Sequence, residues 1–86
     1  MQKLEKWPES YRLYERLKRE RGLSDYRVAA DVGTRQSTFT KWRQLGYVPK
    51  YALMSKIAVE LSTPEELHTA AEFYEADIKA AAGEVS

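Results

Sequence analysis

Hydrophobic residues recur every three or four positions along most of the chain, the spacing expected of helices with one buried face. Sustained alternation of apolar and polar residues does not occur, so the pattern predicts an all-α protein. A first helix is expected over residues 8–21, because Pro8 suits the first turn of a helix and Gly22 suits the position just past its end. Its buried stripe is predicted to consist of Tyr11, Leu13, Tyr14 and Leu17.

Two shorter helices follow, and hydroxyl residues and glycine mark their ends. Ser24 is predicted to cap a helix over residues 25–31, and Gly33 to end it. Thr34 is predicted to cap the next helix, over residues 35–44, which has an apolar and a polar side. The apolar side carries Thr38, Phe39, Trp42 and Leu45, and the polar side carries Gln36, Ser37, Thr40, Lys41, Arg43 and Gln44.

Two further helices complete the predicted set of five. A fourth, over residues 50–61, is expected to bury Leu53, Met54, Ile57, Ala58 and Leu61. The stretch Thr63-Pro64-Glu65-Glu66 has the pattern of a capping box with proline at the first helical position. It predicts a long C-terminal helix over residues 63–82, which Gly83 ends.

The length of 86 residues, with 43% hydrophobic and 31% charged residues, suits one globular domain. We expect an N-terminal arm over residues 1–7, four helices within residues 8–62 and the C-terminal helix over residues 63–82. The chain has no cysteine, which excludes disulfides and cysteine metal sites and suits a reducing cytoplasm. Its apolar runs are too short to span a membrane, so a cytoplasmic location is expected.

The net charge of +1 conceals a strong asymmetry. Residues 1–56 carry thirteen lysines and arginines against six acids, whereas residues 57–86 carry one lysine against seven acids. Between Val32 and Lys56 there are five cations and no acid. A cationic half favours a polyanionic partner, although a merely solvated basic surface is the alternative.

Residues 25–45 predict a helix-turn-helix. Ala29 lets the two helices cross closely, and Gly33 can adopt the positive φ of the turn. Phe39 and Trp42 hold the second helix to the core, so its polar face can lie in the major groove and bond base edges. A simply solvated helix face is the alternative, and the residue spacing, the caps and the acid-free stretch favour DNA.

Seven short motifs follow one another in a distinctive order. They are Leu23-Ser24, Val28-Ala29, Val32-Gly33, Ser37-Thr38-Phe39, Trp42, Pro49 and Ile57-Ala58. In order and spacing the chain resembles the lambda-repressor-like helix-turn-helix family, also called the XRE or Cro/CI family, over about residues 11–67. The resemblance implies a five-helix DNA-binding domain that regulates transcription in bacteria or phages as a dimer on an inverted repeat.

The resemblance also implies which side chains contact DNA. Positions that read bases in the family hold Gln36, Ser37 and Lys41, with Thr40 and Arg35 nearby. Positions that approach phosphates in the family hold Asp25, Tyr26, Arg27, Tyr47 and Lys50. Asp25 stands where the family usually has glutamine and would repel a phosphate, so Arg27 is expected to replace it. We expect base readout by Gln36, Ser37, Thr40 and Lys41, and phosphate contacts by Arg27, Arg35, Arg43, Tyr47 and Lys50.

The predicted C-terminal helix carries an apolar stripe of Leu67, Ala71, Tyr74, Ile78 and Ala81, widened by Ala70 and Phe73. Past Tyr74 this helix should outrun so small a core, leaving Ile78 and Ala81 without cover in their own subunit. A homodimer through residues 67–82 is therefore expected, with Tyr74, Ile78 and Ala81 in the interface. Packing of the first half of the stripe on the fourth helix is the alternative.

Enzymatic chemistry finds no support, because no nucleophile–base pair or glycine-rich phosphate loop occurs. The single histidine, His68, is expected to be exposed, and neither a metal site nor a cofactor is expected. The sequence thus indicates a sequence-specific, double-stranded DNA-binding transcriptional regulator, small and Cro- or repressor-like, with no enzymatic activity. The alternative is an antitoxin or adaptor whose acidic C-terminal helix binds a partner protein.

Overall fold

Pro8 and Gly22 delimit the first helix of the protein, as the sequence predicts. The computed structural model describes residues 6–85, and in it α1 (Glu9–Glu20) begins directly after Pro8. Gly22 follows the last turn with a φ of 68°, a left-handed conformation that glycine adopts without steric cost. Only residues 6 and 7 of the predicted arm are described, and residues 1–5 lie outside the described part.

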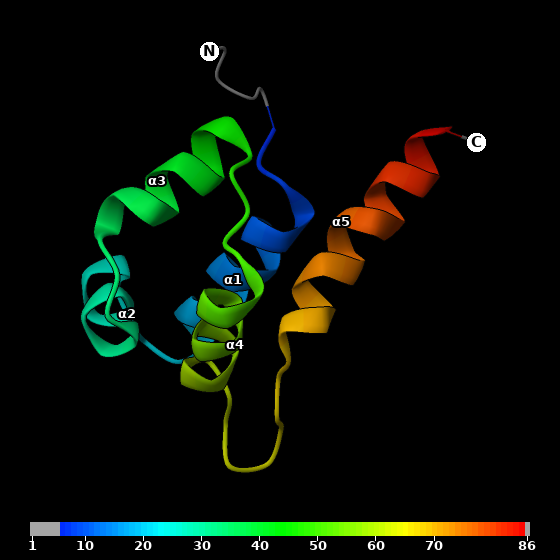
Figure 1. Ribbon diagram of the computed structural model, residues 1–86. Helices are drawn as coiled ribbons and strands as arrows, with labels where there is room; N and C mark the ends of the chain where they lie inside the picture. Colours follow the sequence, from blue (N-terminus) through cyan, green and yellow to red (C-terminus); the bar gives the residue numbers. More distant parts are fainter. Residues whose placement is uncertain (1–5, 86) are drawn as a thin grey trace.

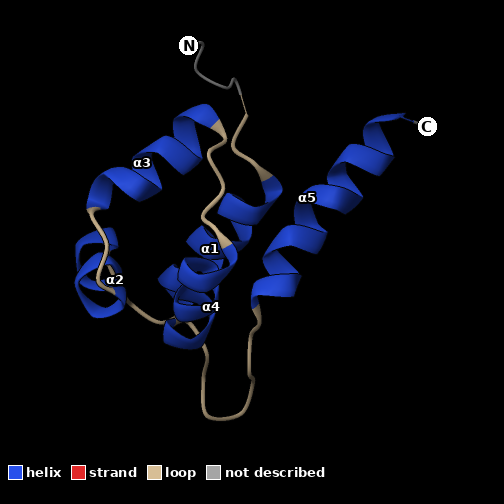
Figure 2. Ribbon diagram, viewed as in Figure 1, coloured by secondary structure: helices blue, strands red, loops and turns tan. Residues whose placement is uncertain are grey.

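Four more helices follow, and all five are shown in Figures 1 and 2. They are α2 (Asp25–Val32), α3 (Gln36–Leu45), α4 (Tyr51–Glu60) and α5 (Ala70–Val85). Residues 6–85 contain no strand, which confirms the all-α prediction for the described chain. None of these described helices is both long and apolar enough to cross a lipid bilayer.

The α1 helix lies in the middle of the fold, as Figure 1 shows. It packs against α5, while α2 packs against α3 and α4, and α4 also contacts α5. The buried hydrophobic residues form one cluster to which every helix contributes. Its members are Tyr11, Tyr14, Leu17, Val28, Ala29, Val32, Phe39, Trp42, Met54, Ile57, Ala58, Leu61, Ala70 and Phe73.

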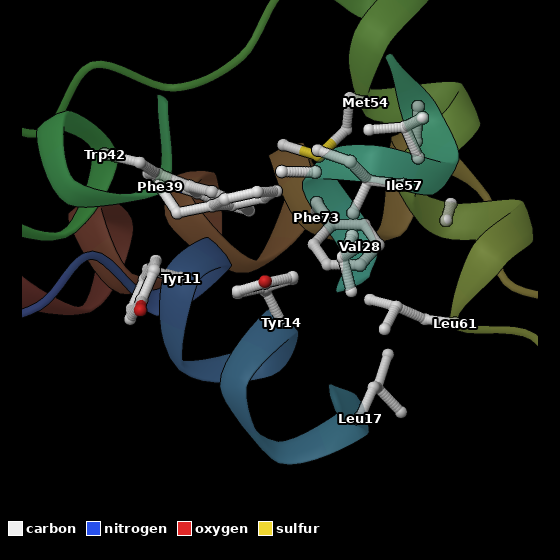
Figure 3. Packing of buried hydrophobic residues seen from close by; sticks show 14 residues of the cluster. Tyr11, Tyr14, Leu17, Val28, Phe39, Trp42, Met54, Ile57, Leu61 and Phe73 are labelled. Carbon is white, nitrogen blue, oxygen red and sulfur yellow. The ribbon is translucent and has the colours of Figure 1, made fainter. Parts of the chain in front are cut away.

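Aromatic rings form the part of this core that holds α3 (Figure 3). The Tyr14 ring on α1 stacks on the Phe39 ring at 4.9 Å between centroids, with the planes 5° apart. The indole of Trp42 meets Tyr11 edge-on at 5.3 Å and Tyr14 at a tilt, also at 5.3 Å. Such pairs add about 0.5–1.5 kcal/mol each beyond the burial of their surface. The inner face of α3 is therefore fixed to α1.

The C-terminal helix begins later than predicted, at Ala70 rather than at the capping box. The capping hydrogen bond does form, because the Glu66 backbone N–H donates to Thr63 Oγ1 at 3.0 Å. The Thr63 N–H also donates to the Glu66 carbonyl, which closes a turn instead of opening a helix. The chain then runs on until the His68 N–H reaches Ser62 Oγ at 2.9 Å, and α5 starts beyond that anchor.

Two other expectations for this region are wrong. His68 is buried, with 6% of its surface exposed, and its Nδ1 lies 3.1 Å from Glu72 Oε2. Gly83 does not end α5, which continues to Val85. The backbone of Gly83 lacks the positive φ of a helix stop, and glycine within a helix costs only about 1 kcal/mol of stability relative to alanine. The three alanines before it favour the helix.

Candidate nucleic-acid interface

The short segment between α2 and α3 sets the relation of these two helices. Ser24 caps α2 as predicted, accepting from the Arg27 N–H at 3.1 Å, and Gly33 ends it with a φ of 76°. Ala29, predicted to allow the close crossing, is buried, and α2 and α3 are in contact. The residue that caps α3 is Arg35 rather than Thr34, whose hydroxyl instead meets the Thr38 hydroxyl at 2.9 Å. The predicted cap is thus misplaced by one residue, because Thr34 finds a side-chain partner inside α3.

The outer face of α3 carries only neutral and cationic side chains. The predicted base-reading residues Gln36, Ser37, Thr40 and Lys41 are all exposed, and none takes part in a described hydrogen bond or ion pair through its side chain. They occupy the first two turns of the helix, and Phe39 and Trp42 on the opposite face are fully buried. The predicted two-sided character of this helix is confirmed, with Thr38 and Leu45 half-buried at the edge of the apolar side.

Asp25, the acid at the start of α2, is turned toward the protein rather than toward this face. Its Oδ1 accepts from Tyr14 Oη at 2.7 Å and from Lys18 Nζ at 2.9 Å. Burial, together with the hydrogen bond to Asp25, raises the pKa of Tyr14. Burial alone would lower the pKa of Lys18, but hydrogen bonds to Glu15 and Asp25 outweigh it and raise that pKa. The negative charge of Asp25 is therefore paired inside the fold with a lysine that stays protonated.

Three of the predicted phosphate-contacting residues are exposed at or near the N-terminal ends of α2, α3 and α4. Arg35 is exposed at the N-terminal end of α3, and Lys50 is exposed as the residue that caps α4. Arg27 is also exposed, but its Nε donates to Asp31 Oδ2 at 2.9 Å. A shallow groove of about 360 Å³ separates α2 from the start of α3, with Tyr26 on one wall and Gln36 on the other.

The other two predicted phosphate contacts have different surroundings. The guanidinium of Arg43 lies over the Tyr11 ring at 6.0 Å, and its Nη1 donates to Tyr11 Oη at 3.5 Å. Arg43 is accordingly half-buried and directed toward α1. Tyr47 is 46% exposed in the loop that follows α3. Of the predicted contact residues, the fold thus exposes those on the first two turns of α3 together with Arg27, Arg35, Tyr47 and Lys50, whereas Arg43 is turned toward α1.

The predicted dimer residues divide into two groups. Tyr74 is half-buried, and its hydroxyl donates to the Pro49 carbonyl at 2.9 Å within the same chain. Ile78 is 66% exposed, and Ala81 is exposed as well. The first half of α5 is used for internal packing through Ala70 and Phe73, whereas Ala71 is exposed. Helix α5 contacts α4, as the alternative interpretation held, and also α1.

Two polar residues that link the inner side of α3 to α5 escaped the sequence analysis. Ser10 is fully buried, and its Oγ accepts from the Trp42 indole N–H at 2.9 Å. The same hydroxyl donates to Asp77 Oδ2 at 2.6 Å. Ser10 and Asp77 are 67 positions apart, so no local pattern of residues could have paired them.

Among residues 6–85, no three histidine, cysteine or acidic side chains gather into a group that could hold a metal ion. Comparison of the chain with models of known protein families, with characterised proteins and with solved structures found no match.

Proposed function

We propose that this protein is a sequence-specific, double-stranded DNA-binding regulator of transcription that reads the major groove with α3. In this proposal α2 and α3 form a helix-turn-helix of the lambda-repressor type, and the protein needs no enzymatic activity. The observation that carries it is the two-sided α3: buried Phe39 and Trp42 fix the helix, while its first two turns present polar side chains without a carboxylate. The N-terminal turns of a recognition helix are those that meet base edges.

The pairing of Asp25 gives independent support. An unpaired carboxylate at the start of α2 would repel a phosphate at the place where such helices approach the DNA backbone. Tyr14 and Lys18 donate hydrogen bonds to this carboxylate from inside the fold, and the lysine charge reduces its repulsion of a phosphate. Arg35, at the start of α3, and Lys50, at the start of α4, are both exposed and can contribute positive charge toward phosphates.

Selection of bound duplexes from a random DNA library tests the proposed function. The purified chain is expected to enrich one sequence, with affinity that falls steeply with salt because lysines and arginines displace counterions from phosphates. Replacing Arg35 or Lys50 by alanine should weaken binding to all duplexes about equally and lower the salt slope by about one unit.

Arg16 offers the matched control for this test. It is an exposed arginine on the face of α1 opposite Tyr11 and Tyr14, the residues that contact α3. Arg16→Ala therefore removes the same charge but should leave the slope unchanged. A library from which no sequence is enriched would contradict the proposed function and would favour the protein-binding adaptor.

The partner proposed for the end of α5 is a second copy of this chain. A single recognition helix reads too few base pairs for high specificity, and two copies on an inverted repeat double the contact. The exposed side of α5 carries Ile78 between Glu75 and Lys79, which have opposite charges and are both exposed. Antiparallel packing of two such helices would bury the isoleucines and bring unlike charges together, so the surface complements itself.

Ile78→Asp is expected to convert a dimer into a monomer, because a carboxylate would be buried without a partner at its centre. Sedimentation equilibrium at micromolar concentrations measures the association directly. Val59→Asp is the matched control, because Val59 on α4 is equally exposed at 64% against 66% for Ile78. A parent chain that remains monomeric, or an Ile78→Asp variant that dimerises like the parent, would refute this interface.

A further inference from the structure

A chain of hydrogen bonds links α3 to α5 through α1. The Trp42 indole N–H donates to Ser10 Oγ at 2.9 Å, and the Ser10 hydroxyl donates to Asp77 Oδ2 at 2.6 Å. The Ser10 backbone N–H donates to the other carboxylate oxygen at 2.9 Å. Trp42 and Ser10 are fully buried, so neither group can exchange its partner for water. A hydroxyl has a single proton, so Ser10 can serve both neighbours only in this direction.

Asp77 has a second role at the beginning of α1. The first N–H groups of a helix lack internal partners and form the positive end of its dipole. Pro8, which precedes α1, supplies no side-chain cap. The Asp77 carboxylate, which belongs to α5, caps the start of α1 instead. Its charge strengthens the hydrogen bond from the Ser10 N–H.

A second contact from α5 holds the segment that follows α3. Tyr74, almost one turn before Asp77, donates its hydroxyl to the Pro49 carbonyl at 2.9 Å. Pro49 lies in the loop between α3 and α4. Through Asp77 and Tyr74, α5 therefore fixes both the inner face of α3 and the chain that leaves it.

We propose that Asp77 is a positioning residue for α3, so that it governs discrimination between DNA sequences without contacting DNA. This inference rests on the proposed function. The direction of the Trp42 indole sets the rotation of α3 about its axis, and that rotation decides where Gln36 and Lys41 reach. Hydrogen bonds to base edges need accurate geometry, whereas a long flexible cation can follow a displaced phosphate. Loss of the Asp77 contact should therefore reduce specific binding and spare non-specific binding.

The test compares Asp77→Ala and Asp77→Asn with Glu65→Gln, which removes one negative charge at an exposed loop position. The affinities for the best selected duplex and for an unrelated duplex are measured at one salt concentration. Asp77→Ala is expected to lower the ratio of the two affinities about tenfold, and Glu65→Gln to leave it unchanged. Asp77→Asn keeps an oxygen for the Ser10 N–H but loses the acceptor for its hydroxyl, so an intermediate ratio is expected.

Hydrogen exchange of the Trp42 indole and of the α3 amides gives a readout that needs no DNA. Both should exchange faster in Asp77→Ala and Asp77→Asn than in the parent and in Glu65→Gln. If Asp77→Ala fails to fold, Asp77→Asn decides, because it retains the cap of α1. Parent-like exchange together with parent-like discrimination in Asp77→Asn would overturn the inference. If the parent binds no duplex, the proposed function fails, and the exchange rates alone then decide whether Asp77 positions α3.

Discussion

Replacing Phe39 by alanine is expected to lower the free energy of unfolding by about 3–5 kcal/mol. Phe39 is fully buried, and its ring lies parallel to that of Tyr14 at 4.9 Å. Alanine would remove the transfer energy of the ring, leave a cavity and end the stacking with Tyr14. Domains of this size are stabilised by only about 5–15 kcal/mol in total, so the variant should lose much of its stability.

Urea unfolding followed by circular dichroism measures this change, with Thr40→Ala as the control on the same helix. Thr40 is exposed, so its replacement should alter the unfolding free energy by no more than about 0.5 kcal/mol. If Phe39→Ala unfolded at the same urea concentration as the parent, Phe39 would not be in the core. The opposite face of α3 could then not be the exposed one, and the proposed base readout would fail with it.

The sequence predicts four of the five helices to within one residue at each end, because local chemistry decides these ends. Ser24 and Gly33 delimit α2 through a side-chain cap and a left-handed backbone, and both signals act between neighbours in the chain. The start of α5 depends instead on contacts formed only in the folded protein. Thr63 forms the capping hydrogen bond that its pattern predicts, but the His68 N–H finds Ser62 Oγ and the imidazole is buried beside Glu72.

The residues of the candidate site likewise include some that the sequence predicts and some that only the folded structure reveals. The exposed residues of α3 follow from helical periodicity, which needs only the sequence. The partners of Asp25 do not follow from it, because Tyr14 and Lys18 lie on another helix. The Ser10–Asp77 contact likewise depends on how two helices far apart in sequence pack together. The exposed residues of α3 and the buried Phe39 and Trp42 were thus predictable, whereas the polar partners on other helices required the fold.

Gln36→Ala and Lys41→Ala are each expected to weaken binding to the preferred duplex by about 1–3 kcal/mol. Glutamine can bond adenine through two edge atoms, and lysine can donate to guanine. Both side chains are exposed, so neither substitution should change the unfolding free energy by more than about 0.5 kcal/mol. The two residues lie on successive turns of α3 and should read different base pairs, so we expect each variant to relax the preference at its own position.

Matched substitutions outside the proposed reading positions separate base readout from general effects. Gln44→Ala removes the same side chain from the last turn of α3, where Gln44 is half-buried, and should cost less affinity than Gln36→Ala. Lys56→Ala removes an exposed lysine from α4 and should leave sequence preference intact. Repeating the library selection with each variant shows which base positions lose their preference.

If the Gln36 and Lys41 variants bound the best selected duplex as tightly as the parent, base readout by these residues would be excluded. Exposed cations such as Arg35 and Lys50 would then account for binding through phosphates alone, and the protein would bind DNA without reading its sequence.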